Sequence, residues 1–419
     1  MPDYKRKKVK RFSNKKTNQH KEEKITMHNK TRRSVVPEEE IKVVRGKKFL
    51  KKQKIKFIST VAVLICLFLL ILSATMPGGL YDNAVNFATL IGHGSYPVSV
   101  SGNILIDSVS NGAYYYVLSD TSIAAYSNNG KILFNELHGF SNPIMKLSST
   151  RVMVYDQGGN FIHLYNLSGK IDTLDTKKEI ITATLADNGS IAVATHSDSN
   201  TSVAVVYDKK FNEVFKWNSA IEIINNVLFN SSGNKLALST ISVVSGQYNS
   251  KLHILNIKSD EPLLHTADLG NSLPLSLANN GRGISIVCKD KYKFLHWSKF
   301  TSNEITSSGE VNICRNTKNG LLLVFNLANN RNDNTVVIVS KKGEKKSEFK
   351  VANAITDIQF NKGRIYLLND TTITIFNKNG KVLRYDETDY GTKKIAVTAS
   401  NSVAAISDTK IIKTNIDKG

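Results

Sequence analysis

Cysteine and tryptophan are scarce in this sequence: 3 Cys and 2 Trp occur among 419 residues. So few cysteines exclude a scaffold that is held together by disulfide bonds. Hydrophobic residues make up 41% of the chain and aromatic residues 8%, which is enough apolar material to bury a large core. We therefore expect a fold that is stabilised by packing.

Motifs that carry their own chemistry are absent after residue 76. No P-loop, HExxH, GxSxG, CxxC or EF-hand pattern occurs there. We therefore predict that the protein is not an enzyme and that it holds no cofactor and no metal ion. His163, His253 and His296 fall at different offsets of the repeat described below. They are expected to be hydrogen-bonded polar residues rather than a ring of metal ligands.

The three cysteines are expected to be free. Cys288 and Cys314 belong to neighbouring repeat units and could approach each other. Disulfide geometry is exacting, however, so buried free thiols are the preferred interpretation and pairing stays open. Cys66 lies in an apolar segment, where a plain apolar role is expected.

Acidic residues are rare near the N-terminus. Residues 1–56 contain 21 Lys and Arg against 6 Asp and Glu, and so supply most of the formal net charge of +21. With almost no aromatics, this segment cannot offset its ordering entropy by burial, so we predict a disordered basic tail. It suits anionic lipid or an acidic partner, or its charge serves only to set membrane topology. Nucleic acid is not the expected partner, because the basic residues 5–11 form a weak pattern.

Residues 57–76 contain no charged side chain. At roughly 1.5 Å per residue they would form about 30 Å of helix, the thickness of a bilayer's hydrocarbon core. Seven Lys and Arg lie between Arg45 and Lys56, whereas the next basic residue after the segment is Lys131. This asymmetry predicts a single-pass cell-membrane anchor with a cytoplasmic N-terminus, followed by a linker at 77–95 and an extracytoplasmic body at 96–419. A cleaved signal peptide is the alternative, but a leader of 56 residues is too long for one.

The body repeats with a period near forty residues. Its most regular apolar strands end at Tyr126, Tyr165, Tyr207, Asn256, Trp297, Ser340, Phe376 and Asn415, at intervals of 39, 42, 49, 41, 43, 36 and 39 residues. About four short strands fit each interval, which is typical of a β-propeller blade. The sequence therefore predicts an all-β, eight-bladed propeller, with seven blades as the alternative.

One complete unit shows the expected strands. They cover 355–360, 364–368, 372–376 and 381–385, with Asn379-Gly380 as a hairpin turn between the last two. The eighth unit supplies only three strands, at 395–398, 402–406 and 411–415. An open ring would leave an unpaired edge, so we predict that residues 96–101 pair with the last strand and close it.

The period and hairpin pattern of residues 96–419 resemble those of quinoprotein-like and YVTN-like β-propellers. The whole arrangement is similar to a family of membrane-anchored bacterial propeller proteins of unknown function. The repeated Trp docking motif of quinoprotein enzymes is absent, because Trp217 and Trp297 are the only tryptophans, and so are the Gly-His and Trp-Asp pairs of WD40 repeats. The resemblance therefore implies a fold and carries over no functional residue.

Aspartate recurs directly after the second strand of six units, and lysine recurs in the turns after the third strand. An aspartate in a tight turn commonly binds backbone amides, which is the structural alternative to a binding role. Because the two kinds of turn lie on opposite faces of a propeller, the faces should differ in electrostatic sign. The linker should join the lysine-bearing face, which would then be membrane-proximal. The candidate binding residues are Asp120, Asp156, Asp198, Asp290, Asp370 and Asp408, and the basic face includes Lys131, Lys170, Lys209 and Lys381.

These features together predict a non-enzymatic protein-interaction scaffold at the cell envelope. The alternative is a propeller that binds a glycan or a small solute, or an enzyme using carboxylates such as Asp120 or Asp370. Acidic and aromatic groups gathered at the channel mouth would favour that alternative. A nucleic acid or ribosome contact through the tail would instead require residues 1–33 and not the propeller.

Overall fold

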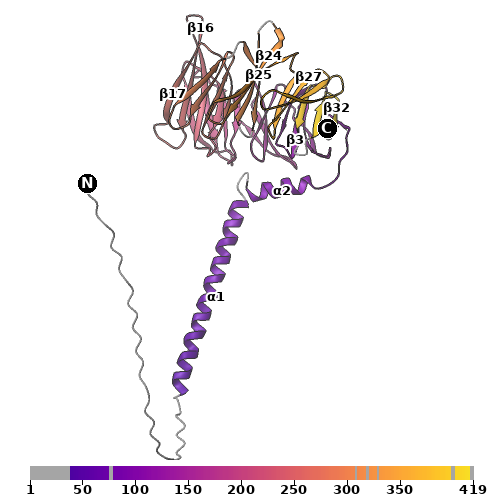
Figure 1. The fold of residues 1–419 in the computed structure, drawn as a ribbon. Coiled ribbons are helices and arrows are strands. Elements are labelled where there is room, and N and C mark those ends of the chain that lie inside the picture. Colours follow the sequence, from indigo (N-terminus) through magenta and orange to yellow (C-terminus); the bar gives the residue numbers. More distant parts are fainter. Residues whose placement is uncertain are drawn as a thin grey trace, which may run out of the picture. The chain divides into compact units, whose positions relative to one another are not determined.

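The computed structural model describes residues 38–74, 79–306, 309–317, 320–327, 330–397 and 402–415. These residues form two helices, α1 (Glu38–Ala74) and α2 (Leu80–Leu90), and 32 strands. The strands make eight four-stranded antiparallel sheets, the blades of a β-propeller, as Figure 1 shows. The eight-bladed fold predicted from the forty-residue period is therefore correct.

In blades 1 to 7 the strands follow chain order from the centre outward, as strands a, b, c and d. Blades 1 to 4 comprise β2 (Leu105–Ser110), β3 (Tyr114–Ser119), β4 (Ser122–Ser127), β5 (Ile132–Leu137); β6 (Pro143–Leu147), β7 (Val152–Asp156), β8 (Phe161–Asn166), β9 (Gly169–Asp175); β10 (Ile180–Leu185), β11 (Ile191–His196), β12 (Ser202–Tyr207), β13 (Glu213–Ser219); and β14 (Ile223–Phe229), β15 (Lys235–Val244), β16 (Gln247–Asn256), β17 (Leu263–Gly270). Blades 5 to 7 comprise β18 (Pro274–Asn279), β19 (Gly283–Cys288), β20 (Lys291–His296), β21 (Ser302–Thr306); β22 (Glu310–Thr317), β23 (Gly320–Leu327), β24 (Asn330–Ser340), β25 (Lys345–Ala352); and β26 (Asp357–Asn361), β27 (Arg364–Asn369), β28 (Thr372–Asn377), β29 (Val382–Glu387). Blade 8 contains β30 (Lys394–Val397), β31 (Ser402–Ile406), β32 (Lys410–Asn415) and β1 (Val98–Ser99).

Blade 8 closes the ring as predicted. Its sheet order is β1-β32-β31-β30, so a strand from before blade 1 supplies the outer position. Val98 pairs with Ile411 and Ser99 with Lys410, and the Val100 amide donates to the Thr409 carbonyl at 3.0 Å. The backbone groups that an open ring would leave unpaired are thus satisfied.

The hydrophobic core lies between blades. Each of its eight clusters combines side chains from two neighbouring sheets; one, for example, joins Tyr116 of blade 1 to Val154 and Tyr165 of blade 2. Strands b are covered on both faces, and every residue of β3, β19 and β31 is buried. Their uniformly apolar sequences are explained by this position.

Two faces follow from the alternating strand directions. The a–b and c–d turns lie on one side, which we call the lysine face. The b–c turns and the connections between blades lie on the other side, which we call the hairpin face. Ser95 is on the lysine face, because a Cβ on Gly130 (φ +83°) in the c–d turn of blade 1 would lie 2.7 Å from the Ser95 carbonyl oxygen. The chain therefore reaches the ring from the side that the sequence predicted.

Two predictions about the N-terminal region need correction. Residues 38–56 were expected to be disordered, but they belong to α1. Glu, Lys and Leu have high helix propensity, and they continue the helix of the apolar segment. The segment 77–95 was expected to be a plain linker, but it contains α2. The predicted disorder of residues 1–37 concerns residues outside those described.

The predicted membrane span falls largely within α1, and its residues 75 and 76 lie outside the described part of the chain. Among the residues that are described, no helix has the length and apolar character that a membrane crossing requires.

Candidate functional site

The six candidate aspartates all lie at the ends of strands b or in the b–c turns, on the hairpin face. Three of them accept hydrogen bonds from the loop that precedes the innermost strand, strand a, of a blade. The Asp120 carboxylate accepts hydrogen bonds from the Asn103 and Ile104 amides at 2.9 and 3.2 Å, which lowers its pKa. Asp156 accepts one from the Asn142 amide at 2.8 Å, and Asp290 accepts one from the Ser272 hydroxyl at 2.9 Å. These contacts give the three residues a structural role.

The other three aspartates are placed differently. Asp408 joins blades 8 and 1: it accepts a hydrogen bond from the Leu105 amide at 2.8 Å and lies 2.6 Å from the Lys393 ammonium, and both contacts lower its pKa. Asp198 is exposed and pairs with Lys178. Asp370 occupies a b–c turn at φ +39°. The six carboxylates therefore lie in separate turns around the ring and do not converge on one site.

The lysine face differs in charge from the hairpin face. In the described connections, basic residues outnumber acidic ones on the lysine face and acidic residues outnumber basic ones on the hairpin face. Lys131, Lys209 and Lys381 lie in c–d turns, and Lys170 is the second residue of the strand d of blade 2. The predicted difference in sign between the faces is therefore present in the described turns.

Helix α2 docks on the lysine face against blades 1 and 2. The Asp82 carboxylate, which is buried, accepts two hydrogen bonds from the Arg151 guanidinium, at 2.9 and 3.1 Å. Asn86 bonds the Thr150 carbonyl at 3.2 Å and the Leu167 amide at 3.3 Å. At the other end, the Lys131 ammonium donates to the Thr89 and Ile91 carbonyls at 2.8 and 2.6 Å, which satisfies free carbonyls of the last turn. Polar contacts thus clamp both ends of the helix.

We expect Asp82→Asn to release α2 while the propeller stays folded. The substitution removes the charge that faces Arg151, and breaking a buried ion pair commonly costs about 3–5 kcal/mol. Hydrogen exchange of residues 80–91 should accelerate at least about tenfold, with the amides of strands b unchanged. Asp260→Asn, at an exposed position on the same face, is the control. Equal protection of α2 in both variants would contradict the clamp.

A buried polar network between blades 3 and 4 was not predicted. Glu222 lies 2.7 Å from the Lys251 ammonium and 2.9 Å from His253 Nε2, while His253 Nδ1 lies 3.0 Å from the Thr266 hydroxyl. Burial raises the pKa of Glu222, but hydrogen bonds from Lys251, His253 and Thr240 outweigh this effect and lower it to about 2. Nothing local in the sequence marks Glu222, because its partners lie on other strands.

His163 packs inside the propeller, and the two cysteines of the propeller do not pair. His163 packs against Phe140 with ring centroids 4.5 Å apart, and burial together with Lys170 and His138 lowers its pKa to about 4. Cys288 is buried, which raises its thiol pKa to about 12. Cys288 and Cys314 are free, as the sequence favoured.

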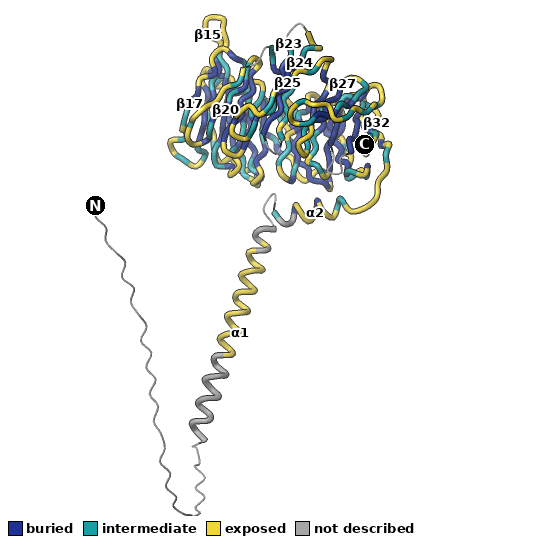
Figure 2. Tube along the Cα trace, viewed as in Figure 1, coloured by how far each residue is buried: buried dark blue, intermediate teal, exposed yellow. Residues whose placement is uncertain are grey.

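Blade 4 carries an apolar patch on the hairpin face. Strands β15 and β16 are ten residues each and extend beyond the neighbouring turns, as Figures 1 and 2 show. Near the tip, Val243, Val244 and Tyr248 are 65%, 57% and 52% exposed. At the base, Ile223, which pairs with Ile241, is 44% exposed, and Ile221 before it is 77% exposed. The sequence signal for this hairpin is the 49-residue interval between Tyr207 and Asn256. We call Ile221, Ile223, Val243, Val244 and Tyr248 the blade 4 patch.

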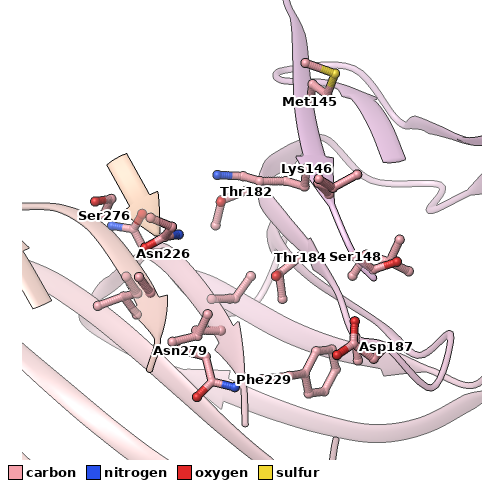
Figure 3. A pocket seen from close by; sticks show the side chains of 18 of the residues that line it. Met145, Lys146, Ser148, Thr182, Thr184, Asp187, Asn226, Phe229, Ser276 and Asn279 are labelled. Carbon is pink, nitrogen blue, oxygen red and sulfur yellow. The ribbon is translucent and has the colours of Figure 1, made fainter. Parts of the chain in front are cut away.

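The centre of the ring contains a cavity of about 530 Å³, lined by strands a of blades 1 to 6. Its polar lining includes the hydroxyl and amide groups of Thr182, Asn226 and Ser276 and also the Asp187 carboxylate. Figure 3 shows the Lys146 amine directed into this space. The sequence did not single out Lys146, because strands a carry no repeated polar motif.

Comparison with known proteins assigns the body to a family. Residues 99–416 match the family described as "Family of unknown function (DUF5711)". The chain belongs to this family. The matched region begins in the ring-closing strand β1 and ends just beyond β32, so it coincides with the propeller. No curated protein matches the chain.

Solved structures share the fold at low sequence identity. The C-terminal WD40 domain of Sif2 is 11% identical with a TM-score of 0.54, and covers 78% of this chain and 100% of its own. BamB from Moraxella catarrhalis is 9% identical with a TM-score of 0.50, covering 77% of this chain and 99% of its own. Dihydro-heme d1 dehydrogenase NirN is 12% identical with a TM-score of 0.50, covering 76% and 71%. Likeness at this level establishes a propeller fold and leaves the function to the surfaces of this chain.

Proposed function

We propose that the protein is a membrane-anchored interaction scaffold at the cell envelope and acts without catalysing a reaction. In this proposal residues 57–76 anchor the chain, the lysine face is turned toward the membrane, and the blade 4 patch binds a protein partner on the far side. The observation that carries the proposal is the blade 4 patch, because it gathers five exposed apolar side chains at blade 4, three of them on the projecting β15–β16 hairpin.

The anchor is supported by the exposed surface of α1. The described apolar side chains include Phe57, Ile58, Leu64 and Phe68, which are 71%, 66%, 59% and 64% exposed. A helix surface of this kind is unfavourable in water and suits a lipid environment. The lysines before residue 57 favour a cytoplasmic N-terminus and an extracytoplasmic propeller. The basic residues 1–56 would contact anionic lipid or an acidic partner on the cytoplasmic side.

The orientation of the propeller follows from chain length. Only five residues separate Ala74 from α2, and five extended residues span at most about 18 Å. Because α2 is clamped to the lysine face, that face would lie close to the bilayer. Its lysines would then be attracted to anionic headgroups, each contributing about 1 kcal/mol near the surface.

A partner site on the hairpin face is consistent with the physics of interfaces. Apolar and aromatic side chains at the centre of a contact supply most of its affinity, and charged residues are depleted there. The blade 4 patch has this composition, whereas the β23–β24 hairpin of blade 6, two blades away, presents Asn330, Arg331 and Asn332. We therefore assign the contact to blade 4 and not to the β23–β24 hairpin.

The test is photo-crosslinking of full-length protein in intact membranes. A photoreactive phenylalanine analogue at Tyr248 should capture one defined protein, and Val243→Asp with Val244→Asp should reduce that product at least about tenfold, since two buried carboxylates would each cost about 2 kcal/mol or more. The same analogue at Asn332 is the matched control. No product above this control would overturn the blade 4 assignment. Protein that fractionates away from membranes would overturn the anchor instead.

A further inference from the structure

Helix α2 turns its polar side toward the propeller. Asp82, the only charged residue of the helix, is buried against Arg151, and Asn86 is buried where it bonds two backbone groups of blade 2. Leu90 packs beside them against the core cluster that blades 1 and 2 share. Residues 82, 86 and 90 follow one another at intervals of four, so they lie on one side of the helix.

The opposite side of α2 is apolar and exposed. Ala84, Phe87 and Ile91 follow one another there at intervals of three and four. Phe87 is 70% exposed, and Ile91, which caps the helix, is 63% exposed. A surface helix in water normally has the reverse arrangement, with its apolar side on the protein and its polar side in solvent. The helix is therefore amphipathic in the sense that suits an apolar partner outside the propeller.

The surface around α2 is basic. In the described connections of the lysine face, basic residues outnumber acidic ones. Lys131 and Lys170 lie on blades 1 and 2, where α2 docks, and exposed Ile132 and Ile171 follow them in the chain. Glu136 is the acidic residue beside Lys170, where its carboxylate accepts a hydrogen bond from the Lys170 amide at 3.2 Å. A helix that lies in a membrane surface combines an apolar side with nearby cations that attract anionic headgroups. Here the helix supplies the apolar side and the propeller supplies the cations.

The place of α2 in the chain identifies the partner as lipid. Only five residues separate it from Ala74, the last described residue of the apolar helix α1. If residues 57–76 cross the bilayer, the chain emerges from the membrane directly before α2. A lipid surface is then the apolar environment within reach of Phe87 and Ile91.

We propose that the apolar side of α2 inserts into the outer surface of the bilayer, at the boundary between headgroups and acyl chains. This inference rests on the anchor in the proposed function and adds a second attachment to it. Because polar contacts clamp α2 to blades 1 and 2, the insertion holds the propeller against the membrane with these two blades nearest to the lipid.

The experiment measures the quenching of tryptophan fluorescence by lipids that are brominated on their acyl chains. The full-length protein is placed in nanodiscs of phosphatidylcholine and phosphatidylglycerol. Phe87→Trp puts the probe on α2, and Tyr248→Trp, at a 52% exposed position on the hairpin face, is the matched control. The parent protein gives the signal of Trp217 and Trp297, which is subtracted. We expect brominated lipid to quench the added tryptophan of Phe87→Trp at least about twofold, because such helices bury their apolar side about 5–10 Å into the membrane surface. The control should not be quenched.

A second pair of variants tests the apolar side itself. In the Phe87→Trp protein, Ile91→Asn should reduce the quenching, because it puts a polar amide on the inserted side. Ile221→Asn changes a 77% exposed isoleucine on the hairpin face and should leave the quenching unchanged. Equal quenching in these two variants would contradict the insertion.

Size-exclusion chromatography of the nanodiscs separates the possible failures. Protein that elutes without lipid would overturn the anchor and, with it, this inference. Protein that stays in the nanodiscs while Phe87→Trp is quenched no more than Tyr248→Trp would overturn the insertion of α2 and leave the anchor standing. Blue-shifted emission of Phe87→Trp without quenching would mean that protein covers this side, and it would overturn the assignment to lipid.

Discussion

Replacing Val98 and Val100 together by aspartate is expected to open the propeller ring. Both side chains are buried, at 8% and 9% exposure, in a cluster that joins blade 8 to Tyr115 and Tyr126 of blade 1. Burying a carboxylate without a partner costs at least about 2 kcal/mol at each position. The free energy of unfolding should fall by about 4 kcal/mol or more, and Tm should fall by about 10 °C.

Ser99→Asp is the matched control for this prediction. Ser99 lies between the two valines on the same strand, but its side chain is exposed. The backbone pairing of Ser99 with Lys410 does not need the hydroxyl group, so the control should melt within about 2 °C of the parent. A double variant that melts with the control would show that β1 does not hold the ring closed. Denaturation followed by circular dichroism measures both proteins.

Glu222→Gln is expected to cost about 3 kcal/mol of stability at neutral pH. The folded protein holds the pKa of Glu222 at about 2, against 4.5 for the unperturbed side chain. Each pKa unit corresponds to about 1.4 kcal/mol. A carboxyl group with a lowered pKa stabilises the fold above its unfolded pKa, and this contribution disappears as pH falls through the folded value. The parent should therefore lose the contribution of Glu222 between about pH 4.5 and pH 2.

The pH profile separates this effect from a simple loss of packing. The gap in unfolding free energy between the parent and Glu222→Gln should be constant above about pH 5 and should shrink as the pH falls toward 2. Glu213→Gln, which changes an exposed glutamate on blade 3, should follow the parent at every pH. A gap that stays the same from pH 7 to pH 2.5 would mean that the ionised carboxylate is not what stabilises the network. Urea denaturation at a series of pH values gives the measurement.

The predicted strand boundaries agree closely with the observed ones, so local sequence patterns are sufficient to place these strands. The third strand of blade 7 was expected at 372–376 and β28 is Thr372–Asn377; the second strand of blade 8 was expected at 402–406 and β31 is Ser402–Ile406. Strands b are the easiest to recognise in the sequence, because both of their faces are covered and the whole segment must be apolar. The ring-closing role of residues 96–101 followed from counting strands in the last unit.

The candidate site was predicted less well than the fold. The aspartates recur at the expected place, but three of them bind the loop leading into a strand a, a contact between segments some 14 to 18 residues apart. The patterns also assigned residues 38–56 to disorder, because composition alone does not show that a helix continues from an apolar segment. The only sequence signal for the exposed blade 4 patch was the unusually long interval of 49 residues between Tyr207 and Asn256.

By itself the sequence determined the period, the number of blades, the turns and the closing strand, since each of these depends on the order of apolar and turn residues within about forty positions. Only the tertiary structure decided which distant side chains meet: Asp82 with Arg151, and Glu222 with Lys251 and His253. The physical reason is that closing the ring brings strands a from different blades around one cavity and presses neighbouring sheets together. A side chain's partners there are set by the register between blades, which the repeat pattern of a single blade does not contain.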